Sequence, residues 1–290
     1  MLRRLYPFES HYLDLDGARY HYVDEGAGDP ILFVHGNPTW SFHFRDLVRG
    51  LSDSHRSIAP DHIGCGMSDK PQHYDYCLRR HIDNLEQLVL RLDLNRITLV
   101  VHDWGGPIGL GVALRHMRRF QRFVLFNTAA FRSRQMPWQL RLARTPMLGE
   151  FLIRRMNLFV RTAIHLAPIE KLSPEVKAGY LLPYDSVENR IAIDRFVRDI
   201  PMQPGDRSFE LLTQIENGSS ALNTRPTLII WGARDFVFTD RFLERWREIL
   251  PAATVWKIEH AGHYVVEDAR DIILPRLKAF LSPVESPRSP

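Results

Sequence analysis

The chain has 290 residues, of which 44% are hydrophobic and 25% are charged, and its formal net charge is +4. This composition predicts a globular protein with a sizeable core, built as one large α/β domain or as a core with an inserted subdomain. The positive charge comes from arginine, and no long basic run is interleaved with aromatic residues, so we expect no nucleic-acid partner.

Only Cys65 and Cys77 are present, and so few cysteines imply no disulfide framework. A chain of this kind is typical of a reducing compartment. The N-terminus has no apolar stretch of signal-peptide length, and no later segment approaches a membrane span. We therefore expect a cytoplasmic protein without stable membrane insertion.

The predicted elements alternate between strands and helices at both ends of the chain. Residues 11–15 and 18–24 form a predicted hairpin around Asp16 and Gly17. Further strands are predicted at residues 30–36, 56–61, 97–102, 123–128, 227–232 and 254–259, with helices near 78–92 and after Gly105. Continuous apolar strands that alternate with helices indicate a mostly parallel, eight-stranded sheet covered by helices on both faces.

This alternation stops over residues 129–225, where helical periodicity is broken by seven prolines and no strand pattern occurs. We interpret this segment as a helical cap inserted into a core formed by residues 1–128 and 226–281. The tail, residues 282–290, is rich in serine and proline and is expected to be disordered.

The first part of the predicted cap, residues 129–165, carries seven arginines and a single acid, Glu150. The plainest interpretation is a solvated helix face. Two alternatives are an assembly surface, for a homo-oligomer or a complex with other pathway enzymes, and a contact with an anionic membrane.

One predicted strand ends in a sharp turn whose tip is a carboxylate. Residues 98–107 read Thr-Leu-Val-Val-His-Asp-Trp-Gly-Gly-Pro, so two glycines follow Asp103 closely and let the backbone bend. In α/β-hydrolases such a strand–turn–helix elbow exposes the nucleophile above the sheet. A serine there suits attack at an acyl carbon, whereas a carboxylate suits displacement at an sp3 carbon and leaves an ester that water can later cleave.

Three more polar motifs follow predicted strands. They are His35-Gly-Asn37-Pro, Trp231-Gly-Ala-Arg-Asp235 and His260-Ala-Gly-His263. Because the carboxyl ends of parallel strands meet at one edge of a sheet, where ligands bind, these motifs should gather around the elbow. Nucleophile, acid and then histidine is the order found in hydrolases.

At these residues the chain resembles the haloalkane dehalogenases of the α/β-hydrolase superfamily, over nearly its whole length up to about residue 281. The resemblance implies that Asp103 is the nucleophile, that His263 activates water and that Asp235 orients this histidine. It also implies that Asn37 and Trp104 donate side-chain hydrogen bonds to the departing halide.

Many members of this family place the acid after the strand that here ends at Asn127, and an asparagine cannot serve as that carboxylate. An Asn–Trp pair with the acid in the later position looks like the third dehalogenase subfamily. That subfamily also contains the β-lactone decarboxylases of bacterial long-chain olefin synthesis. Residues 127–131, 136–138 and 183–185 are similar to those decarboxylases.

Plainer roles exist for three of these residues. Asp235 could pair with Arg234, Asn37 could be a turn residue before Pro38, and Trp104 could fill the core.

The expected nucleophile, acid, histidine and halide-binding pair together favour haloalkane dehalogenase-type hydrolysis. This reaction gives an alcohol and a halide through a covalent aspartyl ester. The alternative is decarboxylation of a β-lactone to a cis-alkene, and a lesser alternative is epoxide hydrolysis, for which Tyr180 and Tyr184 are available. Neither a metal nor an organic cofactor is required. We expect a small apolar substrate in a pocket lined by Phe131, Trp138 and Phe196.

Overall fold

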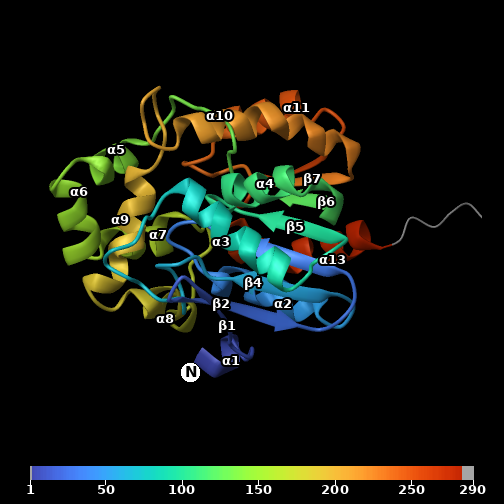
Figure 1. Ribbon diagram of the computed structural model, residues 1–290, viewed down its shortest axis with the longest axis horizontal. Coiled ribbons are helices and arrows are strands. Elements are labelled where there is room, and N and C mark those ends of the chain that lie inside the picture. Colours follow the sequence, from blue (N-terminus) through green and yellow to red (C-terminus); the bar gives the residue numbers. More distant parts are fainter. Residues whose placement is uncertain (1, 283–290) are drawn as a thin grey trace, which may run out of the picture.

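The computed structural model describes residues 2–282, which form one eight-stranded sheet enclosed by helices (Figure 1). The strands are β1 (His11–Leu15), β2 (Ala18–Glu25), β3 (Pro30–Val34), β4 (Arg56–Pro60), β5 (Ile97–Val101), β6 (Phe120–Leu125), β7 (Thr227–Gly232) and β8 (Thr254–Ile258). Their spatial order is β1-β2-β4-β3-β5-β6-β7-β8. Strand β2 is antiparallel to both of its neighbours, and all pairs from β4 to β8 are parallel. The predicted architecture, a mostly parallel sheet of eight strands with helices on both faces, is confirmed.

Helices precede, connect and follow these strands. They are α1 (Leu2–Leu5), α2 (Arg45–Leu51), α3 (Leu78–Arg91), α4 (Gly105–Arg115), α5 (Trp138–Arg144), α6 (Leu148–Glu150), α7 (Leu158–Leu166), α8 (Pro174–Leu181), α9 (Ile191–Arg198), α10 (Phe209–Gly218), α11 (Asp240–Ile249), α12 (Val265–Asp268) and α13 (Arg270–Leu281). Among the described residues, no helix is long and apolar enough to span a bilayer. The predicted disorder of the tail falls almost entirely outside residues 2–282.

Alternation along the strands explains why helices cover both faces. In β3, Leu32 and Val34 join a core cluster with α3, α4, α10 and α11. The intervening Ile31 and Phe33 join a second cluster with α2, α8 and α13. Because both sets are fully buried, each side chain contributes about 1.5–3 kcal/mol through removal of apolar surface from water. A strand buried on both faces therefore reads as a continuous apolar run.

Strand β6 differs from its predicted position. It begins at Phe120, three residues before the expected start, and ends at Leu125. The polar residues Gln121 and Arg122 interrupt the apolar run at the start of this strand. Both are only partly exposed, however, and Arg122 is paired with Thr98 of β5. Tertiary pairing decided this boundary, because the local pattern does not alternate clearly.

The segment between β6 and β7 contains helices and no strand. In Figure 1, helices α5, α6, α7, α8 and α9 lie together at one end of the molecule, on its left. Residues of α5, α7 and α9 share a small apolar cluster of their own, including Ala143, Val160 and Val197. Helix α10 instead packs against α4 of the sheet layer. We refer to residues 129–225 as the cap segment.

Candidate active site

The turn between β5 and α4 places Asp103 at the carboxyl edge of the sheet. Asp103 has a φ of +53°, a left-handed conformation that is uncommon outside glycine. The turn can form because two neighbours lack side chains. A Cβ on Gly36 would lie 2.2 Å from Asp103 Oδ1, and one on Gly105 would lie 2.0 Å from the Val34 carbonyl oxygen. This is the geometry of a strained nucleophile elbow.

The two carboxylate oxygens of Asp103 have different surroundings. Oδ1 accepts a hydrogen bond of 2.7 Å from the backbone N–H of Asn37, and the backbone N–H of Trp104 also interacts with the carboxylate. Oδ2 lies 3.9 Å from Nε2 of His263. One oxygen is therefore held by backbone donors while the other faces the histidine.

His263 is oriented by Asp235 across the strand ends. Its Nδ1 lies 2.8 Å from Asp235 Oδ2, so an Nδ1–H donates to the carboxylate and leaves Nε2 toward Asp103. The other oxygen of Asp235 accepts from the backbone N–H groups of Val237 and Phe238, at 2.6 and 3.0 Å. Asp235 is thus paired with the histidine and not with its neighbour Arg234.

Burial and charge shift the pKa values of this group. Burial raises the pKa of the Asp103 carboxyl, against the opposing effects of His263 and of the Asn37 and Trp104 N–H groups. Burial alone would lower the pKa of His263, but the Asp235 carboxylate and its hydrogen bond outweigh burial and raise it above the usual imidazole value. An imidazole of raised pKa is a competent proton acceptor near neutral pH.

Two side-chain N–H groups also belong to this site. The amide nitrogen of Asn37 lies 3.3 Å from the carbonyl oxygen of Ile193, which occupies one of its two N–H bonds. The indole of Trp104 lines the cavity over Asp103, and its N–H has no acceptor within residues 2–282. Both groups can therefore donate to a leaving group above the carboxylate.

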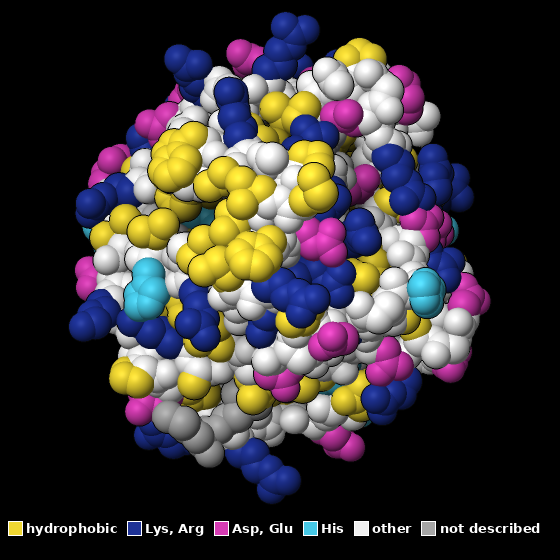
Figure 2. Space-filling model, turned by 90° about the vertical axis from the view of Figure 1, so that its left-hand side faces the viewer, with side chains coloured by type: hydrophobic (Ala, Val, Ile, Leu, Met, Phe, Trp, Pro, Cys, Tyr) yellow, Lys and Arg dark blue, Asp and Glu magenta, His cyan; other side chains and the backbone are white. Residues whose placement is uncertain are grey.

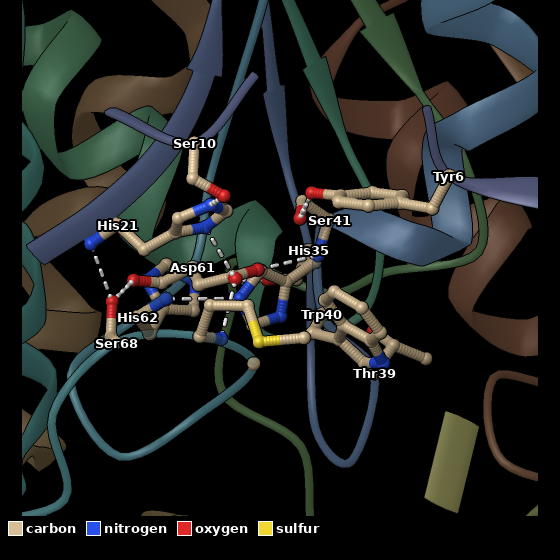
Figure 3. Close-up of polar contacts among 12 residues, drawn as sticks. Tyr6, Ser10, His21, His35, Thr39, Trp40, Ser41, Asp61, His62 and Ser68 are labelled. Carbon is tan, nitrogen blue, oxygen red and sulfur yellow. Dashed lines mark hydrogen bonds and ion pairs between the residues drawn. The ribbon is translucent and has the colours of Figure 1, made fainter. Parts of the chain in front are cut away.

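A buried polar network supports the loop that carries Asn37 (Figure 3). Asp61 accepts from the backbone N–H groups of Ser41 and Met67, at 2.7 and 2.8 Å, and lies 2.8 Å from Nδ1 of His21. Although burial alone would raise the pKa of Asp61, its histidine neighbours hold it below the usual carboxyl value. A buried carboxylate satisfied in this way rigidifies the loop without taking part in chemistry.

Two histidines of the same network join this loop to the segment after β4. His35 donates from Nδ1 to the Gly36 carbonyl and accepts at Nε2 from the backbone N–H of His62. His62 Nε2 donates in turn to the His35 carbonyl at 3.0 Å. Burial lowers the pKa of both histidines, so they remain neutral and structural.

A cavity of about 390 Å³ opens above Asp103 and His263. Its lining comes mostly from the cap segment and from residues 236–238 and 242 after β7. Among the described lining residues, Asp103 is the only carboxylate and His263 the only imidazole. The remaining polar side chains are uncharged, and most of the lining is aliphatic or aromatic, so the cavity suits a neutral apolar ligand.

The three predicted pocket residues have different positions. Phe131 and Trp138 line the cavity. Phe196 does not, and this part of the prediction is wrong: its side chain is 2% exposed, stacks on the ring of His81 at 4.4 Å and lies 5.3 Å from the ring of Trp104. Its face of α9 is turned toward the core, where it supports the indole from behind.

The tyrosines on which epoxide hydrolysis would depend are both directed away from the cavity. Tyr180 is buried and donates to Glu267 at 2.5 Å, and Tyr184 donates to the carbonyl of Thr39 at 3.3 Å. Neither lines the cavity. An oxirane beside Asp103 would therefore lack this pair of acidic donors.

Asn127 has a structural role that its sequence position does not reveal. Its amide nitrogen donates to the Gly232 carbonyl at 3.1 Å, and its amide oxygen accepts from the Gly232 N–H at 2.8 Å. This reciprocal pair joins the ends of β6 and β7 beside Asp235. A carboxylate could accept from the N–H but could not donate to the carbonyl.

Several further residues of the site were not predicted from the sequence. Phe238 lies with its ring 5.7 Å from that of His263, and its position three residues after Asp235 was an available signal. His102 donates from Nε2 to the His263 carbonyl at 2.9 Å and so holds the histidine backbone. The lining residues 200–202 carry no periodic signal, because they belong to an irregular connection.

Fold and site together define an enzyme of the α/β-hydrolase class. A family model described as alpha/beta hydrolase fold matches residues 29–269. The haloalkane dehalogenase DatA from Agrobacterium tumefaciens superposes with a TM-score of 0.85 at 27% identity, over 94% of this chain and 95% of its own.

Comparison of sequences narrows the class further. The cis-3-alkyl-4-alkyloxetan-2-one decarboxylase of Shewanella oneidensis is 44% identical over 99% of this chain and 92% of its own length. That of Xanthomonas campestris is 41% identical over 95% of this chain and 97% of its own. Haloalkane dehalogenase 2 of Mycobacterium tuberculosis is 35% identical over 93% and 94%. The chain belongs to the α/β-hydrolase fold family, in the group that unites haloalkane dehalogenases with these decarboxylases, as the resemblance predicted.

Proposed function

We propose that this enzyme decarboxylates cis-3,4-dialkyl β-lactones, with Asp103 as the nucleophile. The observation that carries the proposal is the cavity, in which one carboxylate and one imidazole are surrounded by uncharged, mostly apolar side chains. Such a pocket binds a hydrophobic molecule and presents its reacting carbon to Asp103. Its volume of about 390 Å³ falls in the range for ligands far larger than a two-carbon haloalkane. Identities of 44% and 41% to the two decarboxylases support the lactone as the substrate.

The first step is attack of Asp103 Oδ2 on the ring carbon that carries the lactone oxygen, from the side opposite that oxygen. A C–O bond forms to Asp103 and the ring C–O bond breaks. The product is an alkyl ester of Asp103 whose neighbouring carbon carries a free carboxylate. The side-chain N–H groups of Asn37 and Trp104 stabilise the oxygen as it leaves.

The second step is collapse of this ester. The carboxylate leaves as carbon dioxide, its bonding electron pair forms the C=C bond, and the Asp103 carboxylate is expelled. Inversion in the first step followed by anti elimination in the second converts a cis ring into a cis-alkene. The free enzyme returns without consumption of water, so this route does not need His263 as a base.

A second candidate function is haloalkane hydrolysis, and the intact pair of His263 and Asp235 favours it specifically. The ester formed from a haloalkane has no carboxylate to lose, so water must attack the Asp103 carboxyl carbon. His263 accepts the proton at Nε2, and the backbone N–H groups of Asn37 and Trp104 receive the oxyanion. Conversely, a decarboxylase that never hydrolysed its ester would have no catalytic use for this pair.

A direct comparison of substrates tests the proposal. We expect kcat/KM for a cis-β-lactone with two long alkyl chains to exceed that for 1-bromohexane by more than about a hundredfold, or about 2.7 kcal/mol of transition-state binding. Alkene and bromide are measured in the same buffer, with 1,2-dibromoethane as a short control. A bromide rate equal to or above the alkene rate would make haloalkane hydrolysis the main activity.

We also propose that the enzyme works in the cytoplasm. Cys65 and Cys77 are both free and buried, which fits a reducing compartment. Fractionation of cells with periplasmic and cytoplasmic marker enzymes tests this, and recovery with the periplasmic marker would contradict it.

A further inference from the structure

Exposed apolar side chains are concentrated on one part of the cap segment. Eight of the thirteen large apolar side chains that are exposed within residues 2–282 lie between positions 138 and 166. This set, called the cap patch below, comprises Trp138, Leu142, Met147, Leu148, Phe151, Met156, Leu158 and Leu166. Figure 2 shows hydrophobic side chains gathered on the face that the cap helices form, with basic side chains around them. A patch of this kind marks an interaction surface.

The cap patch is continuous with the cavity. Trp138, Leu142, Leu158 and Leu166 are exposed to solvent and also line the cavity above Asp103. Trp138 is 70% exposed, so an indole stands in water at the entrance although most of its surface is apolar. Whatever covers the cap patch therefore meets the route by which a substrate enters.

Positive charges predominate around the cap patch (Figure 2). Arg134, Arg141, Arg155 and Arg161 are exposed and form no ion pair with any carboxylate of the described residues. The one acid of this stretch, Glu150, is already paired with Arg154 at 3.0 Å and with Arg198 at 3.1 Å. The free arginines therefore leave a net positive surface beside exposed apolar side chains.

We propose that the cap patch binds the surface of an anionic phospholipid bilayer. The apolar side chains enter the boundary between headgroups and acyl chains, and the arginines face lipid phosphates. Trp138 has the amphipathic character that favours this boundary. A hydrophobic substrate dissolved in the bilayer then passes directly into the cavity, without crossing water.

A second copy of this chain is a poorer occupant of the cap patch. In a two-fold symmetric dimer the same surface faces itself, so unpaired arginines of one protomer would oppose those of the other. An anionic lipid surface supplies the opposite charge at every arginine. The proposal goes beyond the proposed function and holds for a lactone or a haloalkane, because vesicle binding is measured without turnover.

The test is flotation of the full-length enzyme with vesicles of phosphatidylglycerol or phosphatidylcholine. We expect binding to phosphatidylglycerol vesicles that weakens with added salt, and little binding to phosphatidylcholine. Each arginine near an anionic surface is worth about fivefold in partitioning, so Arg141→Glu, Arg155→Glu and Arg161→Glu together should reduce binding at least about a hundredfold.

A matched control separates a local effect from one of net charge. Arg79→Glu, Arg118→Glu and Arg276→Glu reverse three exposed arginines outside the cap segment that form no ion pair within residues 2–282, and this triple variant should bind nearly as well as the wild type. Chemical denaturation verifies that both triple variants are folded. Equal loss in the two triple variants, or wild-type enzyme that does not float with phosphatidylglycerol, overturns the proposal.

Two further measurements test the apolar part of the contact. Met147→Gln with Phe151→Gln removes exposed side chains that do not line the cavity, and should lower binding at least tenfold. Acyl-brominated phosphatidylglycerol should quench tryptophan fluorescence in the wild type and not in Trp138→Phe. Light scattering tests for an oligomer or for a complex with another pathway enzyme. If these variants dissociate such an assembly and the wild type does not bind vesicles, the cap patch is a protein interface and the lipid proposal is wrong.

Discussion

In the proposed mechanism, the two oxygens of Asp103 act in two different steps. Oδ2 faces His263 and is free to attack, whereas Oδ1 already accepts from the Asn37 N–H. When Oδ2 forms an ester, Oδ1 becomes the carbonyl oxygen. It then lies where the backbone donors stabilise the negative charge of hydrolysis, so no rearrangement is needed between the steps.

Replacement of the nucleophile is the most direct test at this scale. We expect Asp103→Ala to lose more than about a hundredfold in kcat with lactone and with haloalkane, because both routes begin with ester formation. Chemical denaturation serves as the control for folding. A folded variant that retained more than about one hundredth of the wild-type rate would exclude covalent catalysis by Asp103.

Removal of the histidine should separate the two activities. His263→Phe is expected to trap a haloalkane as a stoichiometric ester on Asp103, because water is no longer activated. With a cis-β-lactone the same variant should still release alkene within about tenfold of the wild-type rate. Intact-mass spectrometry detects the adduct and gas chromatography the alkene. Absence of any adduct with an accepted haloalkane would contradict the assigned order of steps.

The pH dependence of turnover should also separate lactone decarboxylation from haloalkane hydrolysis. Hydrolysis needs neutral His263, whose pKa is raised above 6.5, so bromide turnover should fall as the pH decreases through neutrality. Lactone opening needs ionised Asp103, whose raised pKa starts from an ordinary value of 3.8, so alkene formation should persist to lower pH. The profiles of kcat/KM for both substrates provide the comparison. Coincident acidic limbs would show that lactone turnover also depends on His263.

At the scale of the elements, the proposed catalytic residues follow the ends of different strands, which must keep their spacing. Asn37 follows β3, Asp103 follows β5, and Asp235 follows β7. Between the last two lies β6, whose end is tied to β7 through the Asn127 pair with Gly232. The asparagine found where many relatives have their acid is therefore a link between strands.

Removal of the Asn127 side-chain amide should lower the stability of the fold. Asn127→Ala leaves the buried Gly232 N–H without a partner and its carbonyl with only the 3.3 Å bond from the Asp235 N–H, so we expect the free energy of unfolding to fall by about 1–3 kcal/mol. Urea denaturation measures the change. The control Asn95→Ala removes an exposed turn asparagine and should stay within about 0.5 kcal/mol. Equal changes in the free energy of unfolding for Asn127→Ala and Asn95→Ala would show that the hydrogen bonds between Asn127 and Gly232 do not stabilise the fold.

At the scale of the whole molecule, one buried carboxylate of the cap segment links the start of that segment to helix α11 of the core. Glu216 of α10 accepts from the backbone and side chain of Arg132, where the cap segment begins, at 3.1 and 2.6 Å. It also accepts from Arg245 of α11 at 3.0 Å. The Glu216 side chain is 7% exposed, whereas the side chains of Arg132 and Arg245 both reach solvent. The lining residue Phe131 directly precedes this joint.

The contribution of Glu216 to the stability of the fold should depend on pH. Although burial alone would raise the pKa of Glu216, its hydrogen bonds from Arg132 hold it below the ordinary 4.5. A carboxyl whose pKa is lower in the folded chain stabilises the fold above the unfolded-state value, and this is lost as the pH falls through the folded-state value. Glu216→Gln should therefore lower the free energy of unfolding by about 1–3 kcal/mol at pH 7. The difference from wild type should shrink below pH 4.5, and a constant difference across urea titrations at pH 7 and pH 3.5 would refute this account.

The sequence alone determined the sheet and the set of polar residues that gather at its edge. Apolar runs that end in short polar motifs are local features of the sequence. Because the carboxyl ends of parallel strands meet at one edge of a sheet, the sequence predicts that Asn37, Asp103, Asp235 and His263 lie together. Seven of the eight strand positions, the two of the hairpin included, and the helical segment between β6 and β7 followed from the same local patterns.

Only the tertiary structure decided which side chains of the cap segment face the cavity. Phe196 and the buried tyrosines Tyr180 and Tyr184 have the residue types of a pocket, yet they pack against the core or bond to buried acceptors. The direction in which a short helix turns its faces depends on contacts with residues far away in the chain, which local periodicity does not encode. For the same reason, the exposed side chains of residues 138–166 became a continuous surface only once the helices were packed.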